Sequence, residues 1–550
     1  MATTNNPTDA ILRVIGIPSW CLVIVPDLNT PVDFMEQLED LLQRNYSNFK
    51  RDENRITLTH NNNTIVYLSV DKQKEFERVE GAVGDFVKAT QWNHFSRKNI
   101  GYLFAIFNGA QFIFDFTDDV FIKLDDKTGK PMDILPEGNE LNEMILKNVK
   151  VVIQGATAFN HHPMMDASLE NSWARGFPME LIQNKSTQGV TEYRIDYPLS
   201  GTLGTQREIG VLQYFIDENP DIDAQLRSKK SLPTLTESSP VLVPSHSYSP
   251  YNAKASIHSR DAMFAILMPS TMSVCISDIW RGYFAQCLFA DAGLSLVFNP
   301  PKTARKHNES ANHCDSQEEA LLYCKCMCCV LTSASIHNLH SRTNASMPFL
   351  LFIICIYTDQ MLHSYYIAVY HNYSVKSGEL IEFLTNWDSD FDTVPQRMEQ
   401  LWLDLNKNGY IEYEDVQKMQ MWLKALYQLG YEFPPLKNRR FHNVAVMGQF
   451  NYVPDSGSSL DNVIFWYQKT SERFRNVIVA GPYSNDQVIE LKKHSIEAIQ
   501  GRDDAGYVSP YLNQMNALLR FKDDDKVNGV LYVHDDGILN MTEIVKGKVS

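Results

Sequence analysis

Apolar positions in the first part of the chain follow first a strand pattern and then a helical one. CLVIV (21–25) is a continuous apolar run of strand length. Thr30 can cap a helix that has Pro31 in its first turn. The apolar face of this helix is formed by Phe34, Leu38, Leu41 and Leu42. This order predicts a strand, a loop and an amphipathic helix.

A second unit of the same kind follows. TIVYLSV (64–70) is typical of a strand, and residues 97–116 predict a helix, a stop at Gly109 and a further strand beginning FIF. The inward face of this helix is predicted to consist of Ile100, Leu103, Phe104 and Phe107. Strands alternating with helices indicate a largely parallel sheet, whose ligands bind outside the carboxyl ends of the strands.

The stretch FIFDFTDD (112–119) places Asp115, Asp118 and Asp119 where such a strand ends. Carboxylates so close together repel one another unless a cation joins them. The alternative is a solvated acidic turn, because Asp is a favoured turn residue. The position at a strand end favours a ligand site.

Composition limits the class of protein. The chain has 550 residues, so we expect two to four domains, and its 50 basic against 66 acidic residues give a net charge of -16. This charge, with no basic patch, argues against nucleic acid as a partner. Arg13 and Pro18 interrupt the first apolar stretch, which therefore predicts neither a signal peptide nor a membrane span. As written, the chain is expected to be cytoplasmic.

Two further motifs contain candidate ligand groups. In SWARGFP, Arg175 could grip phosphate bidentately while Gly176 lets the backbone approach a ligand; alternatively, Arg175 stacks on Trp173 at a surface turn. In SDIWRGYF, Ser277 could cap a helix whose first turn carries Asp278 and Arg281. Asp278 would then present its carboxylate to a ligand hydroxyl or simply complement the helix dipole.

Five sequence blocks follow one another along the chain: RKNIGYLFAIFNGAQFIFDFTDD, FNHHPMMDASLENSWARGFPMELI, ENPDIDAQLR, YNAKASIHSRDA and SDIWRGYFAQCLFADAGLSLVFNPP. In this order they resemble the STELLO-type probable glycosyltransferases and, more weakly, the reversibly glycosylated polypeptides, which are UDP-arabinopyranose mutases. The similarity covers most of residues 15–301 and resumes over 376–435.

The resemblance implies an α/β chain with a GT-A (Rossmann-like) nucleotide-sugar-binding domain. Asp118 and Asp119 would hold Mn²⁺ or Mg²⁺ on the donor diphosphate, with Thr117 where the family usually has a third carboxylate. Catalytic roles are expected for Arg175, which matches the glycosylated arginine of the reversibly glycosylated polypeptides, and for Asp278. Donor contacts are expected from Asp115, Trp173, Arg175, Trp280 and Arg281.

The partners implied are a nucleotide-sugar donor, a glycan or protein acceptor and other glycan-synthesis proteins, in the Golgi. Residues 1–309 would form the glycosyltransferase domain, 376–438 a helical linker and 439–550 a second, truncated GT-A-like domain. The strands predicted in it are NVAVMGQFN, NVIVAGP and NGVLYVHDDG (528–537), and the last of them ends in Asp535 and Asp536. Residues 310–375 interrupt this order as a Cys-rich insertion, expected to be disordered or translated intron sequence.

DLNKNGYIEYED (404–415) resembles an EF-hand calcium loop. Asp at its last position is shorter than the usual bidentate Glu, and no second loop pairs with it, so we expect no Ca²⁺ site. For the whole chain two hypotheses stay open. One is a metal-dependent glycosyltransferase or nucleotide-sugar mutase, and the other is a catalytically impaired partner or assembly protein.

Overall fold

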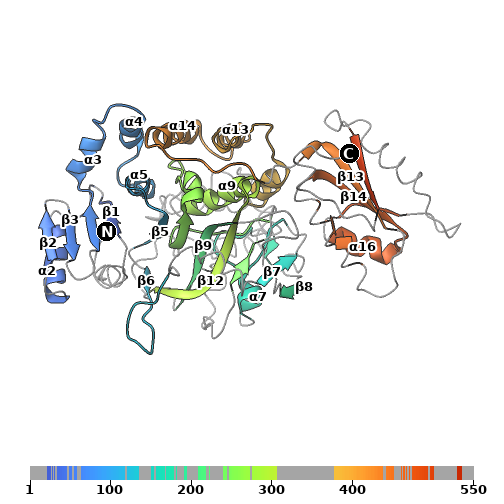
Figure 1. Cartoon of the computed structure of the whole chain (residues 1–550), viewed down its shortest axis with the longest axis horizontal. Coiled ribbons are helices and arrows are strands. Elements are labelled where there is room, and N and C mark those ends of the chain that lie inside the picture. The colour runs from blue at the N-terminus through green and yellow to red at the C-terminus, as the bar shows by residue number, and fades with distance from the viewer. Residues whose placement is uncertain are drawn as a thin grey trace, which may run out of the picture.

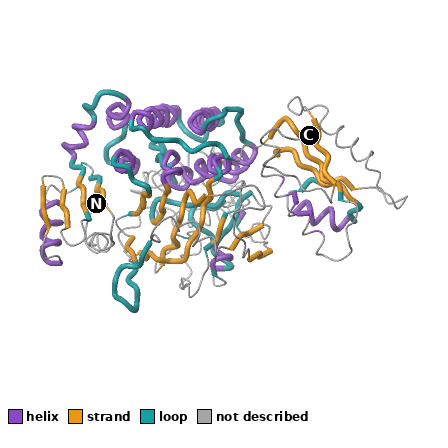
Figure 2. The backbone as a smooth tube through the Cα atoms, in the orientation of Figure 1, coloured by secondary structure: helices purple, strands orange, loops and turns teal. Residues whose placement is uncertain are grey.

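The part of the chain that the structure describes is mixed α/β and contains three β-sheets, which agrees with the predicted α/β class (Figures 1 and 2). The computed structural model describes the following residues, with short gaps inside several ranges: 21–134, 150–153, 157–182, 191–194, 208–217, 222, 240–305, 377–437, 441–450, 460–500 and 529–534. The predicted insertion at 310–375 lies outside these residues.

The first sheet contains both strands predicted near the N-terminus. Its strands, in spatial order, are β1 (Cys21–Ile24), β4 (Thr64–Tyr67), β3 (Arg55–Leu58) and β2 (Phe49–Asp52). β1 and β4 are parallel, as predicted, whereas β2 and β3 form an antiparallel hairpin that the sequence analysis missed. Helix α2 (Phe34–Asn45) buries Leu38 and Leu42 in the same apolar cluster as this sheet.

Short helices lead from this sheet to the central part of the molecule. They are α3 (Val70–Phe76), α4 (Ala82–Ala89), the 3-10 helix η1 (Phe95–Arg97) and α5 (Lys98–Phe107). The α5 prediction is confirmed, with Ile100 and Leu103 buried and Gly109 closing the helix at φ 76°. The predicted inward position of Phe107 is wrong: this side chain is 68% exposed, because Leu103 and Ile106 form the buried face of the last turn.

The central sheet is mixed rather than largely parallel. Its order is β5 (Phe112–Phe116), β11 (Ala255–Ser259), β9 (Glu208–Asp217), β12 (Leu294–Arg305), β10 (Val241–Leu242), β7 (Lys150–Ile153) and β8 (Thr191–Arg194), with β6 (Val120–Ile122) paired to β12. β9 and β12 are parallel, but β11 runs antiparallel to both β5 and β9. The expectation that β5 joins β1 and β4 in one parallel sheet is therefore wrong, because β11 pairs with β5 instead.

A layer of helices covers one face of the central sheet (Figure 1). Helix α9 (Ser277–Ala292) is buried at every one of its 16 positions, since it lies between the sheet and the helices α13 (Val394–Lys407) and α14 (Tyr413–Gln428). Phe284 of α9 contacts Trp402 of α13, with ring centroids 5.7 Å apart. The helices of the predicted linker thus share one apolar core with the first domain. The remaining short helices here are α7 (His162–Met165) and η6 (Arg260–Ala265).

The EF-hand-like segment (404–415) connects helices α13 and α14. Asp404 Oδ2 accepts hydrogen bonds from Trp387 Nε1 (3.0 Å) and from the side chain of Gln400 (2.9 Å). Asp415, at the other end of the motif, is buried and accepts a hydrogen bond from the N–H of Ser270 (2.7 Å). The first and last carboxylates of the motif thus bind different parts of the fold. The absence of calcium binding stays a prediction.

The third sheet is entirely parallel in the order β15 (Ala498–Gln500), β14 (Phe474–Gly481), β13 (Phe441–Gln449), β16 (Gly529–His534). The three strands predicted for this region are confirmed, and α16 (Asn485–Lys493) lies beside them (Figure 1). Asp535 and Asp536 lie outside the described residues. No helix within the described ranges is both long and apolar enough to cross a bilayer.

Candidate functional site

Strand β5 directs Asp115 into the molecule. Ile113 and Asp115 are the two buried positions of the strand, whereas the phenylalanines that alternate with them are only partly buried. Because successive side chains of a strand point to opposite faces, the Asp115 carboxylate shares the inner face with Ile113. Its side chain is therefore beneath the strand end rather than at its surface.

Two cations and one hydroxyl bind this buried carboxylate. Tyr102 donates a hydrogen bond to Asp115 Oδ2 (2.8 Å), the guanidinium of Arg281 lies 3.1 Å from the same oxygen, and Lys98 pairs with Oδ1. Burial and then the Asp115 charge raise the pKa of Tyr102 well above its usual value, so its hydroxyl stays a donor. Lys98 also donates to the carbonyl of Ala253 (3.2 Å). Asp115 thus fastens β5, α5 and α9 together.

A second buried ion pair joins Arg175 and Asp278. Arg175 Nη2 lies 2.9 Å from Asp278 Oδ2, and both side chains are 3% exposed. The backbone N–H groups of Ala253 (3.2 Å) and Ile279 (3.0 Å) also donate to the Asp278 carboxylate. The alternative of an arginine stacked on Trp173 at a surface turn is therefore wrong.

Gly176 lets the Arg175 loop approach α9. It has φ 82°, and a Cβ at this position would lie 2.6 Å from Cγ2 of Ile279. The close approach that the glycine permits is to the helix rather than to a ligand. The predicted cap is also wrong: Ile276 holds the N-cap position, Ser277 is the first helical residue, and no side chain caps the helix.

The first turn of α9 brings distant motifs together. Asp278 pairs with the SWARGFP segment and Arg281 pairs with FIFDF, so three of the resemblance blocks meet at one place in the fold. Arg281 also lies over the ring of Tyr251, with its guanidinium carbon 5.9 Å from the ring centroid. The structure thus assembles four of the predicted site residues, Asp115, Arg175, Asp278 and Arg281.

The two predicted tryptophans lie in the core. Trp173 is 5% exposed and belongs to the main apolar cluster. Trp280 packs against Phe284 and against Tyr410 (centroids 6.2 Å apart), which places it in the contact between α9 and the helical layer. This position gives Trp280 a packing role, and its predicted donor contact has no support in the geometry.

The proposed metal ligands Asp118 and Asp119 lie outside the described residues. On either side of them, the N–H of Val120 donates to the carbonyl of Thr117 (3.1 Å). Among the residues that the structure describes, no three His, Cys, Asp or Glu side chains are grouped so that they could hold a metal ion. Asp115 is already neutralised by Lys98 and Arg281, so it does not replace the carboxylate that Thr117 lacks.

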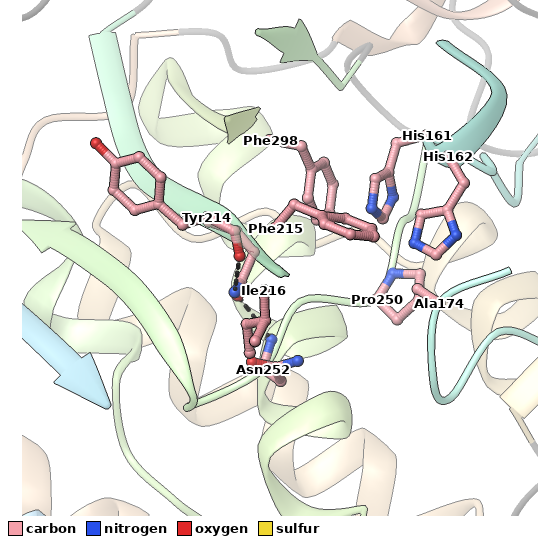
Figure 3. Close-up of a pocket in the computed structure, with 10 residues that line it drawn as sticks. His161, His162, Ala174, Tyr214, Phe215, Ile216, Pro250, Asn252 and Phe298 are labelled. Atoms are coloured by element: carbon pink, nitrogen blue, oxygen red, sulfur yellow. Dashed lines mark hydrogen bonds between the residues drawn. The ribbon is translucent and has the colours of Figure 1, made fainter. Parts of the chain in front are cut away.

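A small cavity lies beside the Arg175 segment (Figure 3). Its volume is about 30 Å³, and its lining comprises His161, His162, Ala174, Gln213, Tyr214, Phe215, Ile216, Pro250, Asn252 and Phe298. His161 stacks on Phe298 with ring centroids 3.3 Å apart and an angle of 6° between the rings. Burial, and secondarily the neighbouring His162, lower the pKa of His161 well below its usual value.

Sequence reasoning missed several members of this region. Lys98 and Tyr102 are four residues apart on the helix that precedes FIFDF, a spacing that places both on one helical face. The adjacent histidines 161 and 162 stand inside one of the quoted blocks but received no role. His258 of β11 also stands inside a quoted block and received no role: it is fully buried, and neither ring nitrogen has a hydrogen-bond partner among the described residues.

Comparison with known proteins shows similarity over most of the chain. Residues 363–451 match the family model of the STELLO glycosyltransferases, a segment that contains α13, α14 and β13. The chain is STELLO-like. Over 443 residues it is 22% identical to "Probable glycosyltransferase STELLO2" of Arabidopsis thaliana, an alignment that covers 79% of this chain and 45% of that protein. The values for "Probable glycosyltransferase STELLO1" of the same plant are identical.

The STELLO-like chain therefore spans less than half the length of the curated relatives that it matches. The predicted resemblance to the STELLO type is confirmed by both comparisons. The matched family segment begins in the last part of the predicted insertion (310–375), spans the predicted linker (376–438) and continues into the third sheet.

Proposed function

We propose that this STELLO-like chain is a glycosyltransferase that uses a nucleotide-diphosphate sugar as donor. The observation that carries the proposal is the convergence of three motif blocks on the first turn of α9, through the pairs Arg175–Asp278 (2.9 Å) and Asp115–Arg281 (3.1 Å). Functional sites combine burial with closely placed charged groups, as these two pairs do. A GT-A-like arrangement of the first domain is part of the same proposal.

The donor diphosphate would be bound through Asp118 and Asp119 with Mn²⁺ or Mg²⁺. Both residues follow β5 in the sequence, and carboxylate oxygens are the ligands that such hard cations prefer. The cation would neutralise charge on the leaving diphosphate. Asp115 would support this site from below, by holding the strand end through Lys98 and Arg281.

Arg175 and Asp278 are the proposed catalytic pair. Asp278 would present its carboxylate to a sugar or acceptor hydroxyl, and Arg175 would orient that carboxylate while binding phosphate oxygens. The N–H groups of Ala253 and Ile279 hold the Asp278 carboxylate in place. The acceptor, a glycan or protein, and the Golgi location implied by the family resemblance belong to the proposal as well.

A second candidate function is a catalytically impaired partner or assembly protein in glycan synthesis. The observation that favours it is that Arg175 and Asp278 are paired with each other and 3% exposed, while Thr117 removes one metal carboxylate. A nucleotide-sugar mutase would use the same donor site and differs only in the fate of the sugar.

Release of free UDP or GDP from a panel of nucleotide sugars, with MnCl₂ and with EDTA, separates these functions. The transferase or its hydrolytic side reaction releases nucleotide only with the metal, and Arg175→Lys slows this release because an ammonium cannot grip phosphate bidentately. A mutase isomerises the sugar without release. Binding with neither outcome would favour the impaired partner, and absence of binding would refute the donor site.

A further inference from the structure

The cavity beside Arg175 presents two imidazoles whose hydrogen bonds are partly fixed by the fold. Nδ1 of His161 lies 2.8 Å from the hydroxyl of Ser249, and Nδ1 of His162 lies 2.8 Å from the hydroxyl of Ser172. The rings meet edge to face with centroids 4.6 Å apart (Figure 3). For His161 this arrangement leaves Nε2 as the ring nitrogen that can bind a ligand.

The lining is polar but carries no permanent charge. Apart from the two histidines, its polar side chains are those of Gln213 and Asn252, because the Tyr214 hydroxyl points away and donates to the carbonyl of Ile134 (2.7 Å) (Figure 3). Burial keeps the His161 ring neutral near pH 7, since it lowers the pKa of this group. A neutral cavity offers nothing that offsets the desolvation of a diphosphate, whereas it can exchange hydrogen bonds with a hydroxyl group.

The size of the cavity limits what can enter. A volume of about 30 Å³ holds one or two groups of the size of a water molecule, because each needs roughly 10–15 Å³ on this measure. A whole sugar ring or a nucleotide is too large. A single hydroxyl or hydroxymethyl group fits.

The cavity adjoins the proposed catalytic pair along two segments. Ala174 lines the cavity and directly precedes Arg175, and Asn252 lines it and directly precedes Ala253, whose N–H donates to Asp278 (3.2 Å). Gln213 accepts a hydrogen bond from the N–H of Asn252 (3.1 Å) and so holds that segment against β9. Two chain segments that line the cavity therefore continue directly into the residues that bind Asp278.

We propose that this cavity is a subsite for one uncharged hydroxyl or hydroxymethyl group of the donor sugar, and that His161 Nε2 is its specificity-determining hydrogen-bonding group. The proposal rests on the proposed function, because it assigns the sugar end of the donor to a place beside Arg175 and Asp278. His161 thereby distinguishes sugars by the hydroxyl that they present, while the nucleotide is bound elsewhere.

Three variants test this role. His161→Phe keeps an aromatic ring against Phe298 but removes both ring nitrogens, and His161→Gln restores a polar group at a similar reach. Tyr248→Phe is the matched control, because the Tyr248 hydroxyl makes a buried hydrogen bond to the carbonyl of Leu384 (3.0 Å) without lining the cavity. Thermal unfolding of each variant identifies any that fail to fold.

The measurement is calorimetric titration with UDP, UDP-glucose, UDP-galactose and UDP-arabinopyranose in MnCl₂, and separately with the free monosaccharides. We expect at least one UDP-sugar to bind the wild type more tightly than UDP. His161→Phe should weaken this sugar by about fivefold, the size of one neutral hydrogen bond, without changing UDP affinity. His161→Gln should recover part of the loss, and Tyr248→Phe should change neither.

The outcomes separate the subsite from the proposed function. The subsite is refuted if UDP binds but no UDP-sugar binds the wild type more tightly than UDP does. It is also refuted if His161→Phe leaves this difference in affinity unchanged. In either case the cavity holds an ordered water only. If UDP does not bind and a monosaccharide binds in a His161-dependent way, the donor site is refuted and the subsite stands. If neither binds, both are refuted.

Discussion

Replacing Arg175 by methionine tests whether the buried pair with Asp278 is formed as described. Methionine retains the apolar length of the side chain and removes the charge, leaving the Asp278 carboxylate with the N–H groups of Ala253 and Ile279 only. Both side chains of the pair are 3% exposed. Removing one partner of a buried pair costs about 3–5 kcal/mol, so we expect the free energy of unfolding to fall by about this amount.

A surface pair provides the control for this experiment. Arg44 and Asp40 on α2 also form an ion pair, but their side chains are 74% and 61% exposed. Exposed pairs contribute about 0–1 kcal/mol, so Arg44→Met should change stability little. In the double variant Arg175→Met/Asp278→Asn the uncompensated charge is gone, and we expect recovery of about 1–3 kcal/mol.

The assay is urea unfolding followed by tryptophan fluorescence for the wild type, both single arginine variants and the double variant. The reasoning is refuted if Arg175→Met costs no more than Arg44→Met, or if Asp278→Asn adds its own loss instead of relieving the first. Either result would mean that Arg175 and Asp278 do not share a buried contact.

Three further predictions concern other parts of the described structure. Burial lowers the folded pKa of His258 well below its usual 6.5, so the unfolded chain takes up the proton first and stability falls below about pH 6.5, by up to about 1.4 kcal/mol per pH unit; urea unfolding between pH 5.5 and 7.5 should show a shallower slope for His258→Phe, and an unchanged slope would contradict this. Gly176→Ala should lower the melting temperature more than Gly129→Ala, because only the former brings Cβ against Ile279 while both have positive φ (82° and 65°); equal shifts would exclude the close approach. Millimolar Ca²⁺ should leave the melting temperature unchanged, since Asp404 and Asp415 bind different parts of the fold, and a calcium-dependent rise that Asp404→Ala abolishes would establish a site there.

Short apolar runs and apolar helix faces in the sequence predicted several elements correctly. These elements are β1, β4, α5 and β5. β9 and β12 were not predicted, since strands covered on both faces show no alternation and their pairing depends on residues far away in the chain. The same limit explains the error in sheet type. Whether β5 pairs in parallel with β4 or antiparallel with β11 is decided by long-range packing.

The sequence predicted several residues of the candidate site but not the ion pairs that they form. Strict alternation in FIFDF could have shown that Asp115 shares the face of buried Ile113, and that reading would have separated it from Asp118 and Asp119. The partners Arg281 and Arg175 could not be assigned from sequence, because each pairs with a carboxylate more than 100 positions away. The prediction that Gly176 lets the backbone approach a ligand was wrong for the same reason. Its close neighbour is Ile279 of α9, which is also distant in the chain.

The most direct test of the account is the binding of UDP-sugars to wild type and Asp119→Asn, with and without Mn²⁺, by isothermal titration. Asp126→Asn is the control, because Asp126 is an exposed carboxylate on the nearby turn between β6 and the segment at Pro131. We predict that binding by the wild type requires Mn²⁺, that Asp119→Asn weakens it at least tenfold at an unchanged melting temperature, and that Asp126→Asn binds normally. Equal binding by wild type and Asp119→Asn, or binding that ignores the metal, would contradict a metal-assisted donor site after β5.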